Sequence, residues 1–163
     1  MASDIIQSLE VKELIQRGAI ISISAVDFIV GATGGWTKNN DGGIATLPAS
    51  QTASTMIVPI TIKNGATIVG FHIHGQLDAA GNTATLDASI REVTPVVTGC
   101  TNTSLGAITQ VSKIADYLLN ETHTLAIPTK TTNGKSHYML ITGTTAAATD
   151  LEINSIDIVY DSI

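Results

Sequence analysis

The sequence has little charge, few aromatic side chains and one cysteine. Only 13% of its 163 residues are charged and 4% are aromatic, whereas an average soluble domain has about 25% charged residues. Because Cys100 is the single cysteine, an intrachain disulfide and a cysteine-based zinc site are both excluded. Lysine and arginine form no run, and the formal net charge is −6. We therefore expect no binding to nucleic acid or to an anionic membrane.

Long apolar segments are also missing. A membrane-spanning helix needs about 18 or more consecutive apolar residues, and no segment reaches that length. The opening residues, MASDIIQSLEVKE, are interrupted by acidic and polar side chains, so they lack the apolar stretch of a secretory signal. We therefore expect a protein that is made in a cytoplasm without an export signal.

What replaces charge is a high content of threonine, alanine, serine, asparagine and glycine. Such a neutral, hydroxyl-rich composition is commoner in extracellular modules and virion proteins than in cytosolic enzymes. The length of 163 residues is sufficient for one domain with a hydrophobic core and too short for two. The sequence therefore predicts one domain with an appendage.

Residues 3–17 have the pattern of a short amphipathic helix, with Ser3 and Asp4 available to cap its start and Gly18 to end it. The apolar stripe consists of Ile5, Ile6, Leu9, Leu14 and Ile15. An isolated helix of about four turns is marginal in water, so it has to dock on another surface. We interpret residues 1–30 as an attachment segment of helix plus strand. Val11 interrupts the stripe, and two short strands are the alternative.

From residue 19 onward, apolar and polar side chains alternate, which is typical of β-strands. Strands are predicted at 19–30 (with a break or bend), 56–62, 67–77, 83–93, 106–114, 122–128, 137–143 and 151–160, and a short one fits at 44–47. Asparagine and glycine at 63–65, 78–82 and 132–135 favour turns between them. For residues 112–121, a helical turn is the alternative to a strand.

This pattern predicts an all-β fold, an antiparallel β-sandwich or jelly roll of about eight strands with a short N-terminal helix or arm. No helix is long enough for a βαβ crossover. The glycine- and asparagine-rich residues 31–43 are predicted to be a loop or linker, so that the β-sandwich domain proper spans residues 44–163.

Catalytic motifs are not found. The chain contains no G-x-S-x-G, no glycine-rich phosphate loop and no H-E-x-x-H. The acidic residues of the predicted strands are expected on solvated faces, and sequence alone pairs none of them as a glycosidase requires. They are Asp87, Glu92, Glu152 and Asp157. We expect no enzyme activity, with a glycan hydrolase as the third alternative.

In the stretch GFHIHGQLDAAGN, residues 70–82, alternation puts His72 and His74 on one face of a strand, away from Phe71 and Ile73. Two histidines alone do not complete a zinc site. The HIH pattern is similar to H-x-H strands of trimeric phage fibres and spikes, where three copies hold an ion. That resemblance implies iron or zinc at His72 and His74 if a trimer axis passes there. The simpler interpretation, which we favour, is that both side chains face solvent and no cofactor binds.

A broader resemblance spans about residues 43–161. The NGATI turn into a long strand, the TLAIP strand before an Asn/Gly loop, and the YMLIT strand carry it. The segment resembles small β-sandwich modules of tailed-phage virions, such as head fibres, capsid decoration proteins and tail-associated modules. The resemblance implies a protein that docks on a capsid or tail protein and is located in the virion. We also expect a homo-oligomer, a trimer, because closed symmetric association covers the strand edges of an acidic, low-charge sandwich.

The function predicted first is therefore a non-enzymatic phage virion structural protein. The alternative is a carbohydrate- or host-receptor-binding module of a phage tail or secreted protein. Sugar sites commonly use an exposed aromatic ring, and Trp36, in its predicted loop, is the candidate for a glycan contact.

Overall fold

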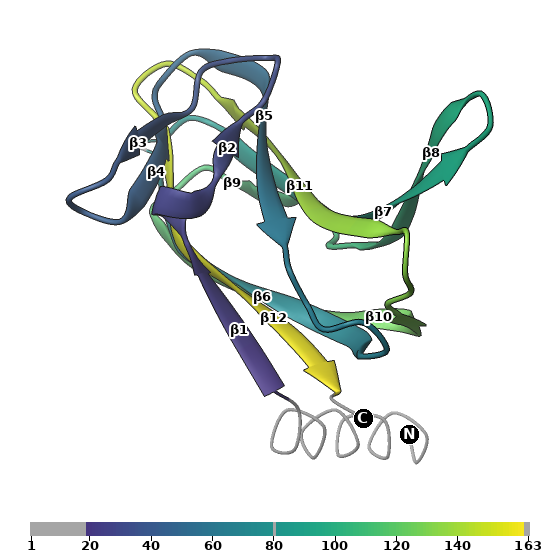
Figure 1. The fold of residues 1–163 in the computed structure, drawn as a ribbon. Coiled ribbons are helices and arrows are strands. Elements are labelled where there is room, and N and C mark those ends of the chain that lie inside the picture. Colours follow the sequence, from purple (N-terminus) through teal and green to yellow (C-terminus); the bar gives the residue numbers. More distant parts are fainter. Residues whose placement is uncertain (1–18, 80, 162–163) are drawn as a thin grey trace.

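The computed structural model describes residues 19–79 and 81–161, which form two antiparallel β-sheets that enclose one hydrophobic core (Figure 1). The first sheet has the order β10-β6-β12-β4-β3, with β1 also paired to β12. Its strands are β1 (Ala19–Ser24), β3 (Thr37–Asn39), β4 (Ile44–Leu47), β6 (Thr67–Asp78), β10 (Tyr117–Lys130) and β12 (Asp150–Asp161). The predicted all-β sandwich is confirmed.

The second sheet has the order β2-β5-β11-β7-β8, and β9 also pairs with β7. Its strands are β2 (Ile29–Val30), β5 (Gln51–Ile60), β7 (Ala84–Val96), β8 (Gly99–Ala107), β9 (Val111–Lys113) and β11 (Ser136–Thr145). A 3-10 turn, η1 (Ala25–Asp27), provides the predicted break in residues 19–30, where the chain passes from the first sheet to the second. No helix in the described ranges is long and apolar enough to cross a membrane.

Alternation along the strands builds the core. In β7, Ala84, Leu86, Ala88 and Ile90 are buried, and the residues between them are half-buried on the outer face. The inward side chains of β11 and β6, such as Met139 and Phe71, are also fully buried. Burial of each such large apolar side chain contributes about 1.5–3 kcal/mol to folding, so the period of two seen in the sequence also decides which face forms the core.

Residues 19–43 belong to the sandwich, although they were expected to precede it. Strand β1 pairs with β12 along its whole length, from Ala19 opposite Tyr160 to Ser24 opposite Ser155, and the side chain of Phe28 is 1% exposed. Strand β3, inside the predicted linker, pairs with β4. The sandwich therefore includes residue 19. The predicted helix lies outside the described residues, and so does its stripe of Ile5, Ile6, Leu9, Leu14 and Ile15.

Two other expectations are corrected. The predicted strand 106–114 is replaced by β8 and β9, which are separated at residues 108–110. Strand β8 is missed because seven of its nine residues are exposed, so no buried face marks it in the sequence. The helical alternative for residues 112–121 is wrong, since β10 begins at Tyr117 and pairs with β6.

Candidate functional site

The two histidines of β6 stand on the outer face of the first sheet, as alternation predicts. Their ring centroids are 6.3 Å apart and their planes differ by 12°. On one side, Nδ1 of His72 lies 2.7 Å from the hydroxyl of Thr122. On the other side, Nε2 of His74 lies 3.1 Å from Oδ2 of Asp157. Neighbouring strands therefore hold both half-buried rings in place.

Electrostatics keeps His72 uncharged at neutral pH. Burial lowers its pKa, the nearby His74 lowers it further, and the charge of Asp157 opposes both without cancelling them. The carboxylate of Asp157 is itself engaged, because the hydroxyl of Ser22 donates a hydrogen bond to it. A neutral imidazole is the form that binds metal ions.

One chain does not supply a complete metal site here. Within residues 19–79 and 81–161, no group of three or more His, Cys, Asp or Glu side chains is arranged to hold an ion. Zinc in proteins takes three or four protein ligands. Iron or zinc at His72 and His74 therefore stays a prediction that depends on ligands from other copies around a trimer axis.

Trp36 is not an exposed aromatic platform. Its side chain is 4% exposed, and its Nε1–H donates a hydrogen bond of 3.1 Å to the carbonyl oxygen of Ser54. A methyl group placed on Gly143 would lie 3.1 Å from the Trp36 ring, so the ring packs against the last residues of β11. Burial removes the ring faces from any sugar. The expectation that Trp36 contacts a glycan is therefore wrong, and Trp36 is a residue of the core.

A polar cavity of about 270 Å³ lies at the opposite end of β5 from Trp36. We call this end, with loops 61–66 and 131–135, the cavity end. Ile60 and Ile62 form an apolar wall. The polar lining includes Asn64, Thr132, Asn133, Lys135, Ser136 and His137. Amide, hydroxyl, ammonium and imidazole groups thus converge on one hollow, which offers both donors and acceptors to a ligand.

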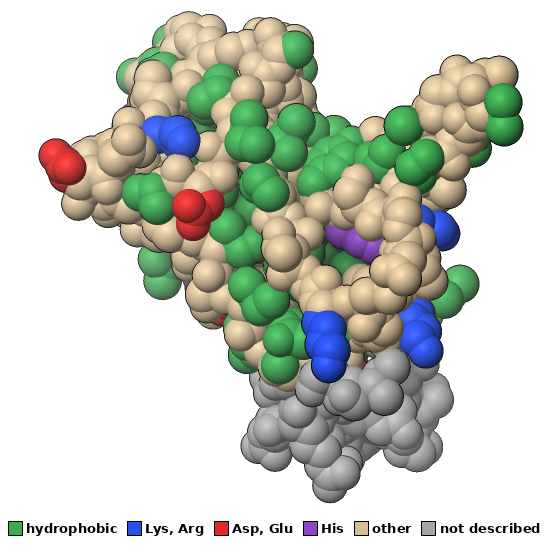
Figure 2. All heavy atoms as spheres, viewed as in Figure 1, with side chains coloured by type: hydrophobic (Ala, Val, Ile, Leu, Met, Phe, Trp, Pro, Cys, Tyr) green, Lys and Arg blue, Asp and Glu red, His purple; other side chains and the backbone are tan. Residues whose placement is uncertain are grey.

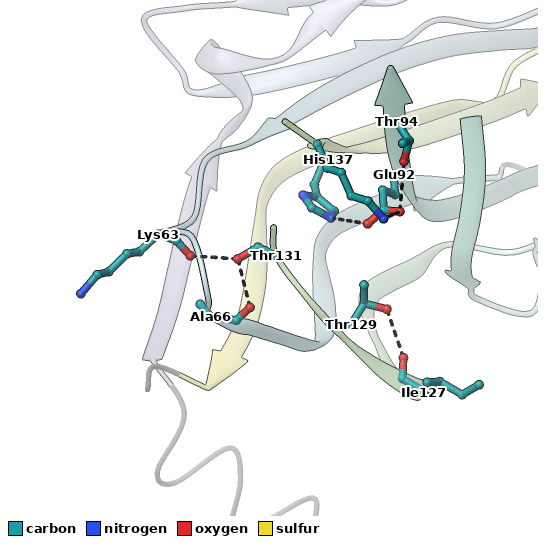
Figure 3. A network of polar contacts seen from close by, with 9 residues as sticks. Lys63, Ala66, Glu92, Thr94, Ile127, Thr129, Thr131 and His137 are labelled. Atoms are coloured by element: carbon teal, nitrogen blue, oxygen red, sulfur yellow. Dashed lines mark hydrogen bonds and ion pairs between the residues drawn. The ribbon is translucent and has the colours of Figure 1, made fainter. Parts of the chain in front are cut away.

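The two loops of the cavity are tied together by Thr131 (Figure 3). Its hydroxyl lies 2.9 Å from the carbonyl oxygen of Lys63 and 3.0 Å from that of Ala66. Its backbone N–H donates to Ala66 and its backbone carbonyl accepts from Gly65. Thr131 is 6% exposed. These buried hydrogen bonds fix the loops relative to each other, so the cavity is preformed.

Behind the cavity, Glu92 of β7 lies close to His137 (Figure 3) and forms an ion pair with Lys135. Nζ of Lys135 donates a hydrogen bond of 2.6 Å to Oε1 of Glu92, and Nε2 of His137 lies 3.3 Å from Oε2. The His137 side chain is 5% exposed. Its Nε2 is buried and has hydrogen-bond geometry with no partner within the described residues, so the contact with Glu92 is a close electrostatic one. The ring therefore holds its nitrogen toward Glu92, behind the cavity.

Glu92 is ionised at neutral pH although it is buried. Burial alone would raise its pKa, but the hydrogen bond and charge of Lys135, together with the proximity of His137, outweigh burial and leave the pKa below its ordinary value. The expectation of a solvated face is wrong for this residue, which is 9% exposed. The sequence contained a usable signal, because the inward alternation that includes Ile90 continues to Glu92.

A second hollow, of about 300 Å³, lies at the other end of β6 and is lined by Gln76, Asp78, Asp116 and Tyr117 among others. Its surroundings are acidic. The pKa of the nearby Asp150 is raised, first by burial and then by the charges of Asp78 and Glu152. The two hollows therefore differ in the sign of the charge around them.

Comparison with known proteins finds similar solved structures. No family model matches the sequence, and no curated protein matches it. Among solved structures, the chain is similar to the CBM36-1 domain of a multidomain xylanase from the hindgut metagenome of Trinervitermes trinervoides. The TM-score is 0.53 with 13% identity over 89% of this chain and 100% of that domain. A CBM22-1 xylan-binding domain from Paenibacillus barcinonensis gives a TM-score of 0.40 with 17% identity over 90% of this chain and 97% of that one. At such identity the first likeness shows the β-sandwich fold.

Proposed function

We propose that this chain is a non-catalytic module that binds carbohydrate in the cavity at the cavity end. The observation that carries the proposal is the convergence of Asn64, Asn133 and Ser136 on one preformed hollow. Each sugar hydroxyl both donates and accepts hydrogen bonds, and asparagine amides and serine hydroxyls offer both functions. The fold adds support, because the similar solved domain is named as a carbohydrate-binding module.

The size of the cavity restricts the ligand. Small-molecule sites have volumes of about 300–1,000 Å³, and this cavity, at about 270 Å³, lies just below that range. A single sugar ring or a chain end fits such a hollow better than the flat side of a long polysaccharide.

The chemistry of the lining predicts weak affinity. Apart from the imidazole of His137, no aromatic ring lines the cavity in the part of the chain that the structure describes. Hydrogen bonds then provide most of the binding, at a net value of about 0.5–1.5 kcal/mol each. Four such bonds correspond to dissociation constants of about millimolar. We expect measurable binding mainly for oligosaccharides displayed in several copies.

A glycan array followed by calorimetric titration tests this function. Asn133→Ala removes both a donor and an acceptor from the cavity and is expected to weaken binding of the best glycan about tenfold, which is the effect of one to two lost hydrogen bonds. Asn40→Ala, in the exposed turn after β3, is the matched control and should bind normally. Absence of binding to any glycan, or equal binding by both variants, would contradict a carbohydrate site in this cavity.

We also propose that the chain assembles as a virion structural protein, and one feature favours this second function. Strand β8 is an exposed edge of nine residues, GCTNTSLGA, without a charged side chain. The hairpin that it forms with β7 projects from the sandwich (Figure 1), and Val97 at its tip is fully exposed. Soluble proteins usually protect such an edge with charge, proline or a covering segment. A homotrimer, or contact with a capsid or tail protein, would cover it.

Mass measurement of the full chain at about micromolar concentration tests assembly. We expect a trimer that Thr103→Lys converts to monomer, because a charge on the β8 edge opposes strand pairing. Asn40→Lys adds the same charge in a turn and should leave the trimer intact. A monomeric wild-type protein would contradict the proposal.

A further inference from the structure

The charges of the described residues are divided between the two ends of the sandwich. Lys63 lies in a loop of the cavity end, Lys130 is the last residue of β10, and Lys135 lines the cavity. Figure 2 shows Lys and Arg side chains at the right and lower centre of this face, and both basic and acidic side chains at its left. A chain whose formal net charge is −6 thus presents lysines around the cavity.

We infer that the cavity prefers a carboxylate-bearing sugar over a neutral one, an inference that rests on the carbohydrate-binding function proposed above. Lys135 provides the central cation. Its side chain is 34% exposed and one of its three N–H groups is used by Glu92. The remaining donors can reach a ligand carboxylate in the cavity.

The acidic residues near the cavity do not cancel this preference. The charge of Glu92 is paired with that of Lys135 in a salt bridge, and Glu92 also lies close to His137. Asp161 ends β12 opposite Thr67, which in turn is opposite Lys130. Because neighbouring strands are about 4.8 Å apart, Asp161 lies two strand spacings from Lys130. Among the described residues, Lys63, Lys130 and Lys135 outnumber Glu92 and Asp161, so this part of the chain carries a net positive charge at the cavity end.

His137 lines the cavity without offering its ring nitrogen to a ligand. Its Nε2 is buried and lies 3.3 Å from Oε2 of Glu92, so this nitrogen faces the Glu92 carboxylate. The cation that a ligand carboxylate can reach in the cavity is therefore Lys135, which is partly exposed.

The hollow at the other end of β6 is not expected to bind an acidic sugar. Asp78 and Asp116 line it, and Asp150 and Glu152 begin the neighbouring strand. Like charges repel a ligand carboxylate there. An acidic sugar is therefore expected to occupy the cavity end alone, so that one ligand binds per chain.

The test uses a matched pair of ligands, digalacturonate and its methyl ester, which differ in charge and little in shape. The full chain is titrated with each by calorimetry at low and at high salt. We expect digalacturonate to bind at least about tenfold tighter in about 50 mM salt, and the difference to shrink in about 500 mM salt because salt screens charges at this range.

Variants assign the preference to residues. Lys135→Gln should remove most of the difference between the two ligands. Lys63→Gln and Lys130→Gln, whose side chains are on the surface, should each remove part of it without disturbing Glu92. Lys113→Gln, beside Tyr117 at the other end, is the matched control and should keep the difference.

Equal or tighter binding of the ester would overturn the inference and leave carbohydrate binding intact. Binding of neither ligand and of no other glycan would overturn both.

Discussion

At one end of the sandwich the indole ring of Trp36 is buried in the core, whereas at the other end a polar cavity of about 270 Å³ is left open. The Trp36 ring packs against β11 near Gly143. The cavity, near the first residues of the same strand, is bordered by Lys135, Ser136 and His137. A buried side chain that fills the space between strands adds packing contacts and stability. An open polar cavity has fewer packing contacts and lower stability, but its polar side chains remain accessible to a ligand.

The largest effect is expected from Trp36→Ala. Truncation of a buried aromatic side chain costs about 3–5 kcal/mol, so the free energy of unfolding in denaturant should fall by that amount. Trp36→Phe keeps most of the volume, loses the hydrogen bond to Ser54 and should cost less. Because Trp36 is the single tryptophan, its fluorescence should also resist quenching by iodide. An easily quenched native protein would show that the ring is exposed.

A smaller effect is expected from Gly143→Ala. The added methyl group would lie 2.6 Å from Cδ2 of Leu47 and 3.1 Å from Trp36, so the core has to shift. Overpacking of this kind costs about 1–3 kcal/mol. The control is Gly34→Ala, where nothing lies within 4 Å of the added group, and thermal unfolding of the two variants should separate them. Equal melting temperatures would mean that this end is loosely packed.

At the cavity end, Glu92→Gln should lower stability by about 1–3 kcal/mol at neutral pH, because it removes a buried charge-assisted hydrogen bond to Lys135. Since the folded pKa of Glu92 lies below its ordinary value of 4.5, its ionisation contributes stability above that pH, and the contribution is lost as the pH falls through the folded pKa. Denaturation at several pH values should show the difference between wild type and variant shrinking below about pH 4.5.

Glu152→Gln provides the comparison for this experiment, because Glu152 accepts a hydrogen bond from Gln76 at an exposed position. It should change stability by less than about 0.5 kcal/mol, as surface substitutions usually do. If Glu92→Gln changes the free energy of unfolding as little as Glu152→Gln at every pH, the buried pair of Glu92 and Lys135 does not stabilise the fold.

The smallest effect is expected on the outer face, between the two ends. The double substitution of His72→Thr and His74→Thr should change stability by at most about 0.5 kcal/mol, because both side chains are half-buried on the sheet surface. Metal analysis of the wild-type protein separates the two interpretations of this pair. About one iron or zinc ion per three chains, lost with the substitutions, would establish the trimer-axis site instead.

Most strands could be predicted from the sequence, because alternation marks a strand with one buried face. Strands β6, β7 and β12 follow that pattern along most of their length. Strand β8 does not, since it is exposed on both faces, and β3 is only three residues long. The orientation of His72 and His74 followed from the same rule.

The candidate cavity could not be predicted, because its groups come from distant parts of the chain. Lys135 and Glu92 are 43 residues apart, and Thr131 and Lys63 are 68 apart. The pairing of β7 with β11 sets His137 opposite Glu92, and the pairing of β6 with β10 places the loop of Lys63 beside Thr131. The burial of Trp36 could not be predicted for the same reason. The glycine-rich residues around it have no alternating pattern that would indicate a buried side chain.

The sequence by itself determined the all-β class, the core faces of the long strands and the lack of a recognisable catalytic motif, because each depends on neighbouring residues or on composition. Tertiary structure alone decided which end is filled by Trp36, which end remains a cavity, and that Glu92 is buried beside Lys135 and His137. The reason is physical. Side-chain alternation is a local property, whereas strand neighbours are selected by the free energy of the whole core, to which residues far apart in the chain contribute together.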